Sequence, residues 1–426
     1  MILHVACLPF PSYQGTQAAL HAMLRASTES GHEAHLLVYS HGAYEIDAPY
    51  PVHRVPDFPK VRSLRSGPSV GKLVLDARAI GQVRSLVRSL RPEAIIAHHV
   101  EAALVGLAAR VRPLYYVAHT CLERELPVYL PTLPQSLVSL AGRQTEALVC
   151  RGAQGVAAVS PSLAATFGVA SHYLPVPWPR AAGLVRPSQT EAREALGLRR
   201  DAHLCLYAGN LDRYQGWEDL LQALPRLRAT HDRAALLVAT ESDPTPVLVA
   251  ARQMGIDGWV HFRRLDGERA RALAHAAGDL AWIPRRIDGG LPIKMLDALA
   301  RGLPVVAMDR ATAGLSVAEA CVVVADDDPA ALAFAAGRLL DDTRARDRLR
   351  ERGFHYLATE HGTSSFDAAM KALLGQTTGG PTPCGQPRSA GVAPRARRDR
   401  AAHTIDTRRA RPKERPRPLG NRQRRR

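Results

Sequence analysis

The residues best suited to chemistry lie in the second half of the chain, where a glycine loop separates an apolar strand from a helix. Asp288-Gly289-Gly290 forms a loop that needs unusual backbone freedom, and Lys294 and Asp297 follow on the helix. Such a loop can bind an anion, because unpaired backbone amides and the positive end of the helix dipole point at it. A carboxylate one turn further on can accept hydrogen bonds from a sugar diol. The alternative interpretation is an ordinary solvated pair of Lys294 and Asp297.

Local signals place this loop between two strands of a parallel sheet. Leu280–Ile283 is typical of a buried strand, and Pro292 suits the first position of a helix, where its missing N–H costs nothing. Gly302 should end the helix before the next strand, Val305–Ala307. Asp297 falls opposite the apolar face of this helix, so we expect its carboxylate to be accessible.

The pattern G-G-L-P-x-K-x-x-D-A-L-A-x-G-x-P-V-V-A resembles the donor-nucleotide motif of retaining glycosyltransferases of family 4, which have the two-domain GT-B fold. That family usually has a Glu, seven residues and a second Glu, followed by Ala-x-Ala and Gly-x-Pro-Val-Val. Asp297 stands at the second acid, whereas the first falls at Gly289, with Asp288 beside it. The resemblance implies that Asp297 binds ribose hydroxyls and that the amides of Gly290 and Leu291 hold phosphate or donor sugar. It also implies a catalytic role for Asp288.

A second glycine loop, from Gly209 to Gly216, follows the strand Leu204–Ala208. Family members commonly have an Arg after the first Gly and a Lys before the second, both holding the diphosphate. Asn210 and Gln215 occupy those places, and Tyr-Gln-Gly resembles the YQG variant of the group 1 glycosyltransferases. Because buried phosphates without cations would be costly, other nearby residues must supply the charge. The candidates are Arg213, Arg285, Arg286 and Lys294, and only one of the adjacent pair Arg285 and Arg286 should face the site.

The first half of the chain alternates strands and helices, as a parallel α/β domain does. Gly15 precedes a helix that Thr16 is predicted to cap. By resemblance Gly15 faces the cleft and approaches the donor phosphate or the acceptor; a plain tight turn is the alternative.

His119 ends a strand, and the resemblance implies that it is a catalytic residue that hydrogen-bonds the donor sugar; a satisfied structural histidine is the alternative. His98 and His99 are adjacent, so we expect them to point to opposite faces, which argues against a joint metal site.

The net charge of +16 over 426 residues is concentrated at one end of the chain. Residues 376–426 contain 15 Lys and Arg against 3 Asp and Glu, a net of +12, which leaves +4 for residues 1–375. This tail is rich in Pro, Gly and Arg, so we predict that it is disordered. The charge therefore does not indicate nucleic-acid binding by the folded part.

No apolar run is long enough to span a membrane, and no basic leader precedes the first strand. The six cysteines are scattered and predicted to be reduced thiols, as in a cytoplasmic protein. Arg84, Arg88 and Arg91 flank the apolar stripe of the helix Lys72–Leu90 and could bind anionic lipid head groups, although such arginines are usually just solvated. The predicted location is the cytoplasm, free or at the inner face of the membrane.

The predicted fold class is α/β, with the GT-B arrangement of two Rossmann-like, doubly wound domains that face each other across a cleft, plus the basic tail. The predicted parts are an acceptor-side domain (1–178), a hinge (179–200), a nucleotide-sugar-binding domain (201–358), a helix that crosses back to the first domain (359–375) and the disordered tail (376–426).

The sequence thus predicts a retaining glycosyltransferase of the hexosyltransferase type. It would move a sugar from a nucleotide-diphosphate donor to a glycan, a lipid-linked or a small-molecule acceptor, without a cofactor or bound metal. The sequence contains no G-x-G-x-x-G motif after the first strand of either half, and no G-x-S-x-G or Walker motif. The motifs of an oxidoreductase, a hydrolase and a kinase are therefore missing. Two alternatives stay open: a nucleotide-sugar epimerase on the same fold, or a scaffold that binds nucleotide sugars without turnover.

Because the tail has no apolar periodicity with which to dock, deletion of residues 376–426 should leave the melting temperature and donor binding unchanged. Thermal unfolding and calorimetry of the truncated and full-length chains check this. A large loss of either would mean that the tail is a structural part of the protein.

Overall fold

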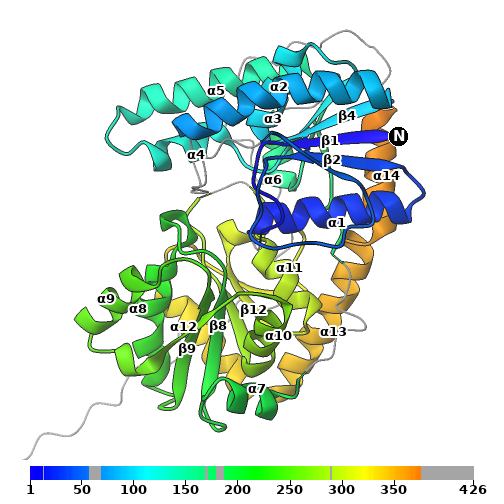
Figure 1. Cartoon of the computed structure of the whole chain (residues 1–426). Helices are drawn as coiled ribbons and strands as arrows, with labels where there is room; N and C mark the ends of the chain where they lie inside the picture. Colours follow the sequence, from blue (N-terminus) through cyan, green and yellow to red (C-terminus); the bar gives the residue numbers. More distant parts are fainter. Residues whose placement is uncertain (13, 57–68, 168–170, 179–186, 288–289, 376–426) are drawn as a thin grey trace, which may run out of the picture. The chain divides into compact units, whose positions relative to one another are not determined.

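The computed structural model describes residues 1–12, 14–56, 69–167, 171–178, 187–287 and 290–375. Over these residues the chain builds two parallel sheets, each covered by helices on both faces (Figure 1). Both sheets consist of short strands, and the inner strands are almost wholly buried, as parallel strands covered on both faces must be. The predicted α/β class with two Rossmann-like domains is confirmed.

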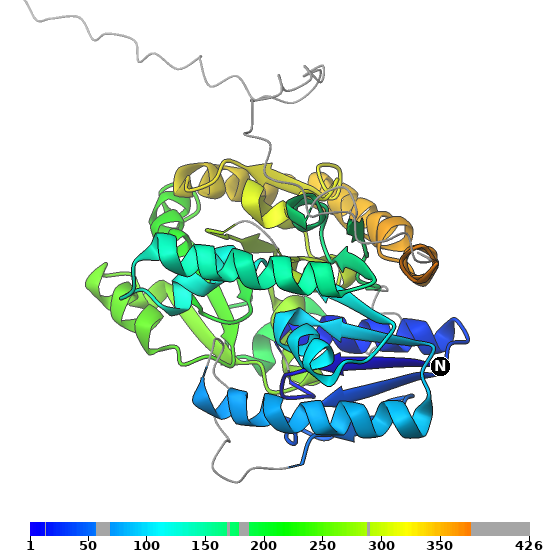
Figure 2. The same cartoon turned by 90° about the horizontal axis from the view of Figure 1, so that it is seen from above.

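The first lobe contains a seven-stranded sheet in the order β3-β2-β1-β4-β5-β6-β7. Its strands are β1 (Ile2–Ala6), β2 (Ala34–Val38), β3 (Val52–Arg54), β4 (Ala94–His98), β5 (Leu114–Ala118), β6 (Gly155–Ala158) and β7 (Ser171–Tyr173). The helices are α1 (Gly15–Glu29), α2 (Val70–Leu90), α3 (His99–Ala109), α4 (Leu122–Tyr129), α5 (Gln135–Gly152) and α6 (Pro161–Phe167), joined by α14 (Thr363–Leu374) from the end of the folded chain. Helices α2, α3 and α5 lie on one face of the sheet, and α1 and α14 lie on the other (Figures 1 and 2).

The second lobe contains a six-stranded sheet in the order β10-β9-β8-β11-β12-β13. Its strands are β8 (His203–Ala208), β9 (Ala234–Thr240), β10 (Val260–Arg264), β11 (Leu280–Ile283), β12 (Val305–Met308) and β13 (Cys321–Val324). The helices are α7 (Gln189–Ala195), α8 (Trp217–Arg228), α9 (Thr245–Gln253), α10 (Glu268–Ala277), α11 (Ile293–Ala300), α12 (Pro329–Asp341) and α13 (Thr343–Glu360), with single 3-10 turns η1 (Arg213–Gln215), η2 (Asp257–Trp259) and η3 (Asp309–Thr312).

Alternate residues of each strand in the second lobe face different helix layers. Cys205, Tyr207, Leu280 and Trp282 pack with α8, α9 and α12, whereas their neighbours join a core that continues into the first lobe. In both sheets the strand order reverses beside the first strand, between β1 and β4 and between β8 and β11. Ligands of open α/β sheets bind at the carboxyl ends of strands at such a switch point.

Several predicted boundaries need correction. Thr16 does not cap the first helix, because α1 begins at Gly15 with Gln14 at the N-cap position. Pro292 occupies the N-cap position of α11 and not its first turn. The exposed Arg84 donates from Nε and Nη2 to the carbonyl oxygens of Ala109 and Ala108, at 3.2 and 2.7 Å, at the end of α3, and its contact with lipid stays a prediction. The predicted tail lies outside the described residues.

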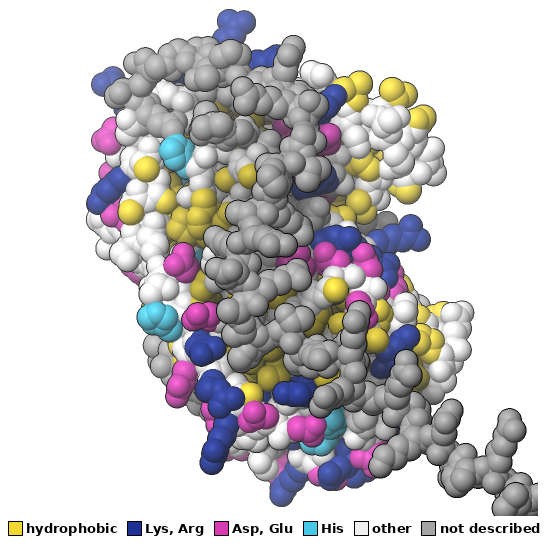
Figure 3. All heavy atoms as spheres, turned by 180° about the vertical axis from the view of Figure 1, so that it is seen from behind, with side chains coloured by type: hydrophobic (Ala, Val, Ile, Leu, Met, Phe, Trp, Pro, Cys, Tyr) yellow, Lys and Arg dark blue, Asp and Glu magenta, His cyan; other side chains and the backbone are white. Residues whose placement is uncertain are grey.

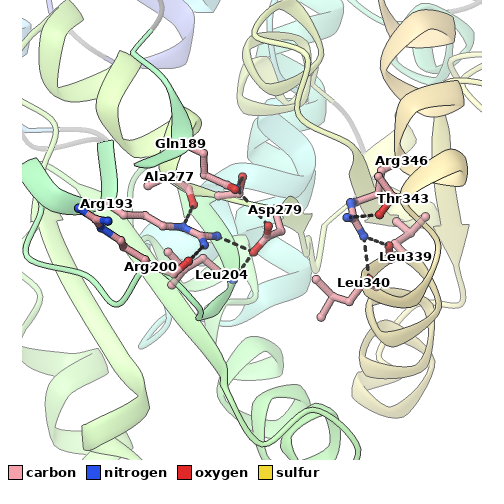
Figure 4. Close-up of polar contacts among 11 residues, drawn as sticks. Gln189, Arg193, Arg200, Leu204, Ala277, Asp279, Leu339, Leu340, Thr343 and Arg346 are labelled. Atoms are coloured by element: carbon pink, nitrogen blue, oxygen red, sulfur yellow. Dashed lines mark hydrogen bonds and ion pairs between the residues drawn. The ribbon is translucent and has the colours of Figure 1, made fainter. Parts of the chain in front are cut away.

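The predicted hinge also contains ordered structure. Residues 189–195 form α7, which begins with a capping box between Ser188 and Glu191. The buried Arg193 of this helix donates to Asp279 Oδ2 at 2.8 Å and to the carbonyl oxygens of Ala277 and Arg200 (Figure 4). These bonds attach the end of the predicted hinge to the second lobe.

Two connections hold α14 and the segment before it against the first lobe. His361 Nδ1 lies 2.7 Å from the carbonyl oxygen of Val176, and the backbone N–H of Trp178 donates to the His361 carbonyl at 2.8 Å. Tyr115 OH donates to the carbonyl oxygen of Leu374 at 3.3 Å.

On the face shown in Figure 3, acidic and basic side chains of the described residues are interspersed, which is typical of a solvated surface.

The bond network of Arg193 predicts a selective loss of stability. Arg193→Leu leaves the Asp279 carboxylate without its buried cation, and breaking such a pair typically costs about 3–5 kcal/mol. Arg199→Leu is the control, because Arg199 and its partner Asp201 are exposed, and such pairs contribute roughly 0–1 kcal/mol. Urea unfolding of both variants checks this; equal midpoints would contradict the structural role of Arg193.

Candidate functional site

Gly290, in the loop between β11 and α11, lies where the two lobes meet. Its φ is +68°, and a Cβ at this position would lie 2.8 Å from the carbonyl oxygen of His119 and 3.1 Å from Nη2 of Arg285. Both the backbone conformation and the lack of space therefore require glycine here. The loop brings the backbone of the second lobe against the end of β5. Asp288 and Gly289 lie outside the described residues, so their roles stay predictions.

Lys294, on the first turn of α11, directs its ammonium group at the loop after β8. Nζ donates to Gln215 Oε1 at 2.6 Å and to Tyr207 OH at 2.8 Å. Gly209 comes so close that a Cβ there would lie 3.2 Å from Nζ. The predicted alternative of a surface pair between Lys294 and Asp297 is wrong, because the ammonium group lies among the residues of the second glycine loop.

The environment of Lys294 is poor in negative charge. Burial lowers the pKa of Lys294 well below its ordinary value, the nearby Arg285 lowers it further, and Asp212 raises it. Its two hydrogen-bond acceptors, an amide oxygen and a phenol, are neutral. A buried ammonium group with neutral acceptors gains most from an added anion. This part of the site is therefore suited to phosphate.

Tyr207 connects Lys294 to the residue that stands at the family's Arg position. Its hydroxyl group accepts from Lys294 and donates to the carbonyl oxygen of Asn210 at 2.5 Å. Asn210 Nδ2 in turn donates to Asp212 Oδ2 at 2.8 Å. The motif pattern gives no indication of Tyr207; the only signal is a hydroxyl group in an otherwise apolar strand, two residues before the glycine.

The three candidate arginines lie in different places. Arg285 is buried beside the glycine loop, with its guanidinium carbon 5.8 Å from the centroid of the Tyr214 ring. Arg286 instead pairs with Asp219 of α8 at 3.0 Å. Arg213 is exposed at the start of η1. As predicted for adjacent residues, only one of Arg285 and Arg286 approaches the loop.

Asp297 lies inside a buried ion-pair network, contrary to the expected accessible carboxylate. Its Oδ2 accepts from Arg271 Nη1 at 3.0 Å and its Oδ1 accepts from Arg301 Nε at 2.9 Å. Burial by itself would raise the pKa of Asp297, but His275, Arg271 and Arg301 hold it below its ordinary value. The helix face opposite the apolar one is covered by α10, which supplies Arg271 and His275, and periodicity cannot reveal this. Any contact with ribose would share the carboxylate with these arginines.

His119 is buried at the end of β5, with both His98 and His99 against it. His98 Nδ1 lies 3.0 Å from His119 Nε2, and the His99 ring stacks on the His119 ring at 4.6 Å between centroids. The expectation that His98 and His99 point to opposite faces is wrong. His99 adopts φ +69° as the strand ends, and this turn brings its ring back to His119.

The first lobe also supplies the start of α1 and a carboxylate on α4. A Cβ at Gly15 would lie 3.4 Å from Cβ of Ile293, so the beginnings of α1 and α11 are neighbours. Burial raises the pKa of Asp212, and Glu125 of α4 raises it further, which shows that these two carboxylates are close enough to interact. Described site residues from both halves of the sequence therefore meet, because Gly290 lies against His119 and Gly15 lies against the start of α11, where Lys294 reaches Gln215.

Comparison with known proteins identifies the kind of domain in each lobe. A family model described as "Glycosyltransferase Family 4" matches residues 13–169, and a family model described as "Glycosyl transferases group 1" matches residues 202–342. The chain carries two glycosyltransferase domains. They correspond to the two lobes, and the predicted resemblance to group 1 glycosyltransferases is thereby confirmed.

A curated relative of these glycosyltransferase domains is the D-inositol 3-phosphate glycosyltransferase of Thermomonospora curvata, which is 29% identical over 211 residues, or 46% of this chain and 47% of the relative. The chain thus spans about half the length of the curated relatives it matches. Among solved structures, sucrose-phosphate synthase from Thermosynechococcus elongatus has a TM-score of 0.71 at 16% identity, covering 88% of this chain and 98% of its own. HepE from Anabaena in complex with UDP-glucose has a TM-score of 0.68 at 15% identity, covering 88% and 100%. The predicted GT-B fold is confirmed.

Two further predictions concern metals and membranes. Among the described residues, no group of three or more His, Cys, Asp or Glu side chains is arranged to hold a metal ion. None of the helices that the structure describes is long and apolar enough to cross a bilayer. A metal-free reaction and a cytoplasmic location stay predictions.

The network around Asp297 predicts that Asp297→Ala lowers stability, although sequence periodicity alone indicates a dispensable side chain. The change leaves Arg271 and Arg301 without their shared carboxylate, and loss of one partner of a buried pair costs about 3–5 kcal/mol. Asp347→Ala is the control, because Asp347 forms an exposed pair with Arg350. Urea unfolding at neutral pH measures both. An unchanged midpoint for Asp297→Ala would mean that the arginines do not depend on this carboxylate.

Proposed function

We propose that the protein is a retaining glycosyltransferase that moves a sugar, such as a hexose, from a nucleotide-diphosphate donor to a glycan, lipid-linked or small-molecule acceptor. The observation that carries the proposal is the half-buried Lys294, which points into the second glycine loop with only neutral hydrogen-bond acceptors. In this proposal the negative charge of the diphosphate compensates the positive charge of Lys294. The presence of UDP-glucose in the HepE complex supports a nucleotide sugar as donor.

The diphosphate would lie between the loop after β8 and the beginning of α11. Lys294 and Arg285 would offset its charge, and the amides of Gly290 and Leu291 would donate to a phosphate or to the sugar. The N-terminal end of α11 adds a favourable dipole at the same place. These groups would stabilise the negative charge that develops on the leaving phosphate, which is the main requirement of the reaction.

The acceptor would approach from the first lobe. We propose that His119 donates a hydrogen bond to the donor sugar and that the acceptor hydroxyl attacks on the face from which the phosphate leaves. The leaving phosphate would take the acceptor proton, so that no protein carboxylate pair at the spacing of glycosidases is needed. Asp297 would contact the ribose while retaining its arginines.

Contact with a membrane surface would depend on Arg84, Arg88 and Arg91, of which Arg84 also donates to the carbonyl oxygens at the end of α3. The proposed location is the cytoplasm or its membrane face.

Incubation with UDP-glucose alone and with candidate acceptors separates the proposal from its alternatives. Transfer with retained anomeric configuration supports it. An isomerised sugar without acceptor would indicate an epimerase, and tight binding without any turnover would indicate an inactive scaffold.

Lys294 provides the sharpest test of the donor site. Lys294→Met keeps the length of the side chain but removes its charge, so it should weaken UDP-glucose on the order of ten- to a hundredfold, the effect of one charge-assisted hydrogen bond. Uridine, which lacks phosphate, should bind almost as before. Calorimetry with both ligands measures the difference.

Lys371→Met is the control for loss of a lysine, because Lys371 is exposed on α14 and pairs with Asp367. Equal losses for UDP-glucose and uridine in Lys294→Met would contradict the phosphate role.

A further inference from the structure

Three buried histidines form a hydrogen-bonded row across the first sheet and end at the candidate site. His4 Nδ1 lies 2.9 Å from His98 Nε2, and His98 Nδ1 lies 3.0 Å from His119 Nε2. The three side chains belong to the neighbouring strands β1 and β4 and the end of β5, and all are almost inaccessible to solvent. The family motif accounts only for His119.

The strand register explains why the rings meet. His4 pairs with Ile96 of β4, and His98 lies two residues further along the same strand. His98 pairs with Val117 of β5, and His119 again lies two residues further along. Because residues two apart in a strand share a face, all three rings lie on one face and step toward the carboxyl edge.

Burial keeps the three imidazoles uncharged at neutral pH. It lowers the pKa of His4 to about 3. It also lowers the pKa values of His98 and His119 well below their ordinary value, and neighbouring histidines lower both further. A neutral imidazole has one N–H and one bare nitrogen, so each ring can donate to one neighbour only. The three tautomers are therefore coupled, and the row can run in one of two directions.

The two ends of the row decide the direction. In one direction every ring carries its hydrogen on Nδ1, and in the other every ring carries it on Nε2. His4 Nε2 is buried and has no hydrogen-bond partner in the described part of the chain. It therefore ends the row as either a bare acceptor or an unpaired N–H. Unpaired buried N–H groups are rarer in proteins than unpaired acceptors, which favours hydrogen on Nδ1 throughout.

At the other end, Nδ1 is the nitrogen of His119 that stays available to a ligand. Within the described residues the only hydrogen bond of the His119 ring is the one between its Nε2 and His98 Nδ1. The His99 ring covers a face of the His119 ring, at an interplanar angle of 24°. A ligand can therefore reach this imidazole in its plane, at Nδ1.

We propose that His4 and His98 are positioning residues that hold His119 as the neutral Nδ1–H tautomer, so that it donates a hydrogen bond to a sugar oxygen and does not act as a base. The identity of the acceptor atom rests on the proposed function. The tautomer of His119 does not, because it follows from the protein alone.

Long-range proton–nitrogen NMR of the full chain labelled with 15N-histidine tests the tautomer directly, without any ligand. The His119 signals are identified by their loss in His119→Gln. The expected result is a neutral ring with hydrogen on Nδ1 at neutral pH. A neutral ring with hydrogen on Nε2, or a charged ring, would overturn the proposal.

A matched pair of variants then tests the role of His98. The side-chain oxygen or nitrogen of Asn, like a carboxylate oxygen of Asp, occupies nearly the place of His Nδ1. His98→Asn can still donate to His119 Nε2 and should keep the Nδ1–H tautomer. His98→Asp can only accept when ionised, so His119 should move its hydrogen to Nε2 or become charged. The same tautomer in both variants would contradict the role of His98.

His4→Asp tests transmission through the row, because His4 contacts His98 and a change at His119 must pass through that ring. We expect the same inversion as in His98→Asp. The control is His35→Asp, the same substitution in a similar pair of the same sheet, His35 with His53 at 2.9 Å. An unchanged His119 in His4→Asp, or a changed one in His35→Asp, would contradict the coupled row.

Calorimetry connects the tautomer to the ligand. In His98→Asp the affinity for UDP-glucose should fall on the order of tenfold, about the effect of one hydrogen bond, while UDP, which has no sugar to contact His119, should bind as before. Full affinity for UDP-glucose would overturn the donor role of His119. If no nucleoside diphosphate and no nucleotide-diphosphate sugar binds the wild-type chain, the proposed function fails, whereas the NMR result on the tautomer stands.

Discussion

The arrangement of the site depends on one half-buried ammonium group without a carboxylate partner in direct contact. Lys294 extends from a short helix toward Gly209, where an added Cβ would lie 3.2 Å from Nζ, and it donates to an amide and a phenol. Removing an ammonium group from water is costly unless opposite charge compensates, and here that charge is only partly present, at Asp212. The neighbouring Arg285 adds a second positive charge that this negative charge must also compensate. The free protein is thus prepared for an anion, at some cost to its own stability.

This constraint explains the glycines around the site better than flexibility does. At Gly209 a Cβ would lie 3.1 Å from Cε of Lys294, a tight contact, and at Gly290 it would collide with the carbonyl oxygen of His119 in the first lobe at 2.8 Å. Both positions let backbone or cation approach where a Cβ leaves no room. As a result, the N-terminal end of α11, the ammonium group of Lys294 and the end of β5 lie close together. The candidate site therefore lies at the carboxyl edges of the sheets, where ligands of such topologies bind.

The sequence was sufficient for the architecture because parallel strands covered on both faces appear as short apolar runs between helices. It failed where a third element intervenes. Asp297 is on the polar side of its own helix, but α10 covers that side and supplies Arg271. His98 and His99 are adjacent, but the left-handed turn at His99 cancels the alternation of a strand. The three residues of β3 were too few to detect, and α7 was hidden in a polar stretch. Such effects depend on tertiary contacts, which periodicity does not encode.

The loss of two expected cations from the second glycine loop is compensated in space and not in sequence. Gln215 stands where the family resemblance leads one to expect a Lys, yet its amide oxygen is hydrogen-bonded to the ammonium group of Lys294, which is supplied by another element 79 positions later. A comparison position by position therefore finds no positive charge at Gln215, whereas in the structure the charge of Lys294 lies beside it. A lysine on a helix is also anchored more firmly than one in a loop, because the helix fixes its backbone. The motif departure that seemed to argue against phosphate binding is consequently consistent with it.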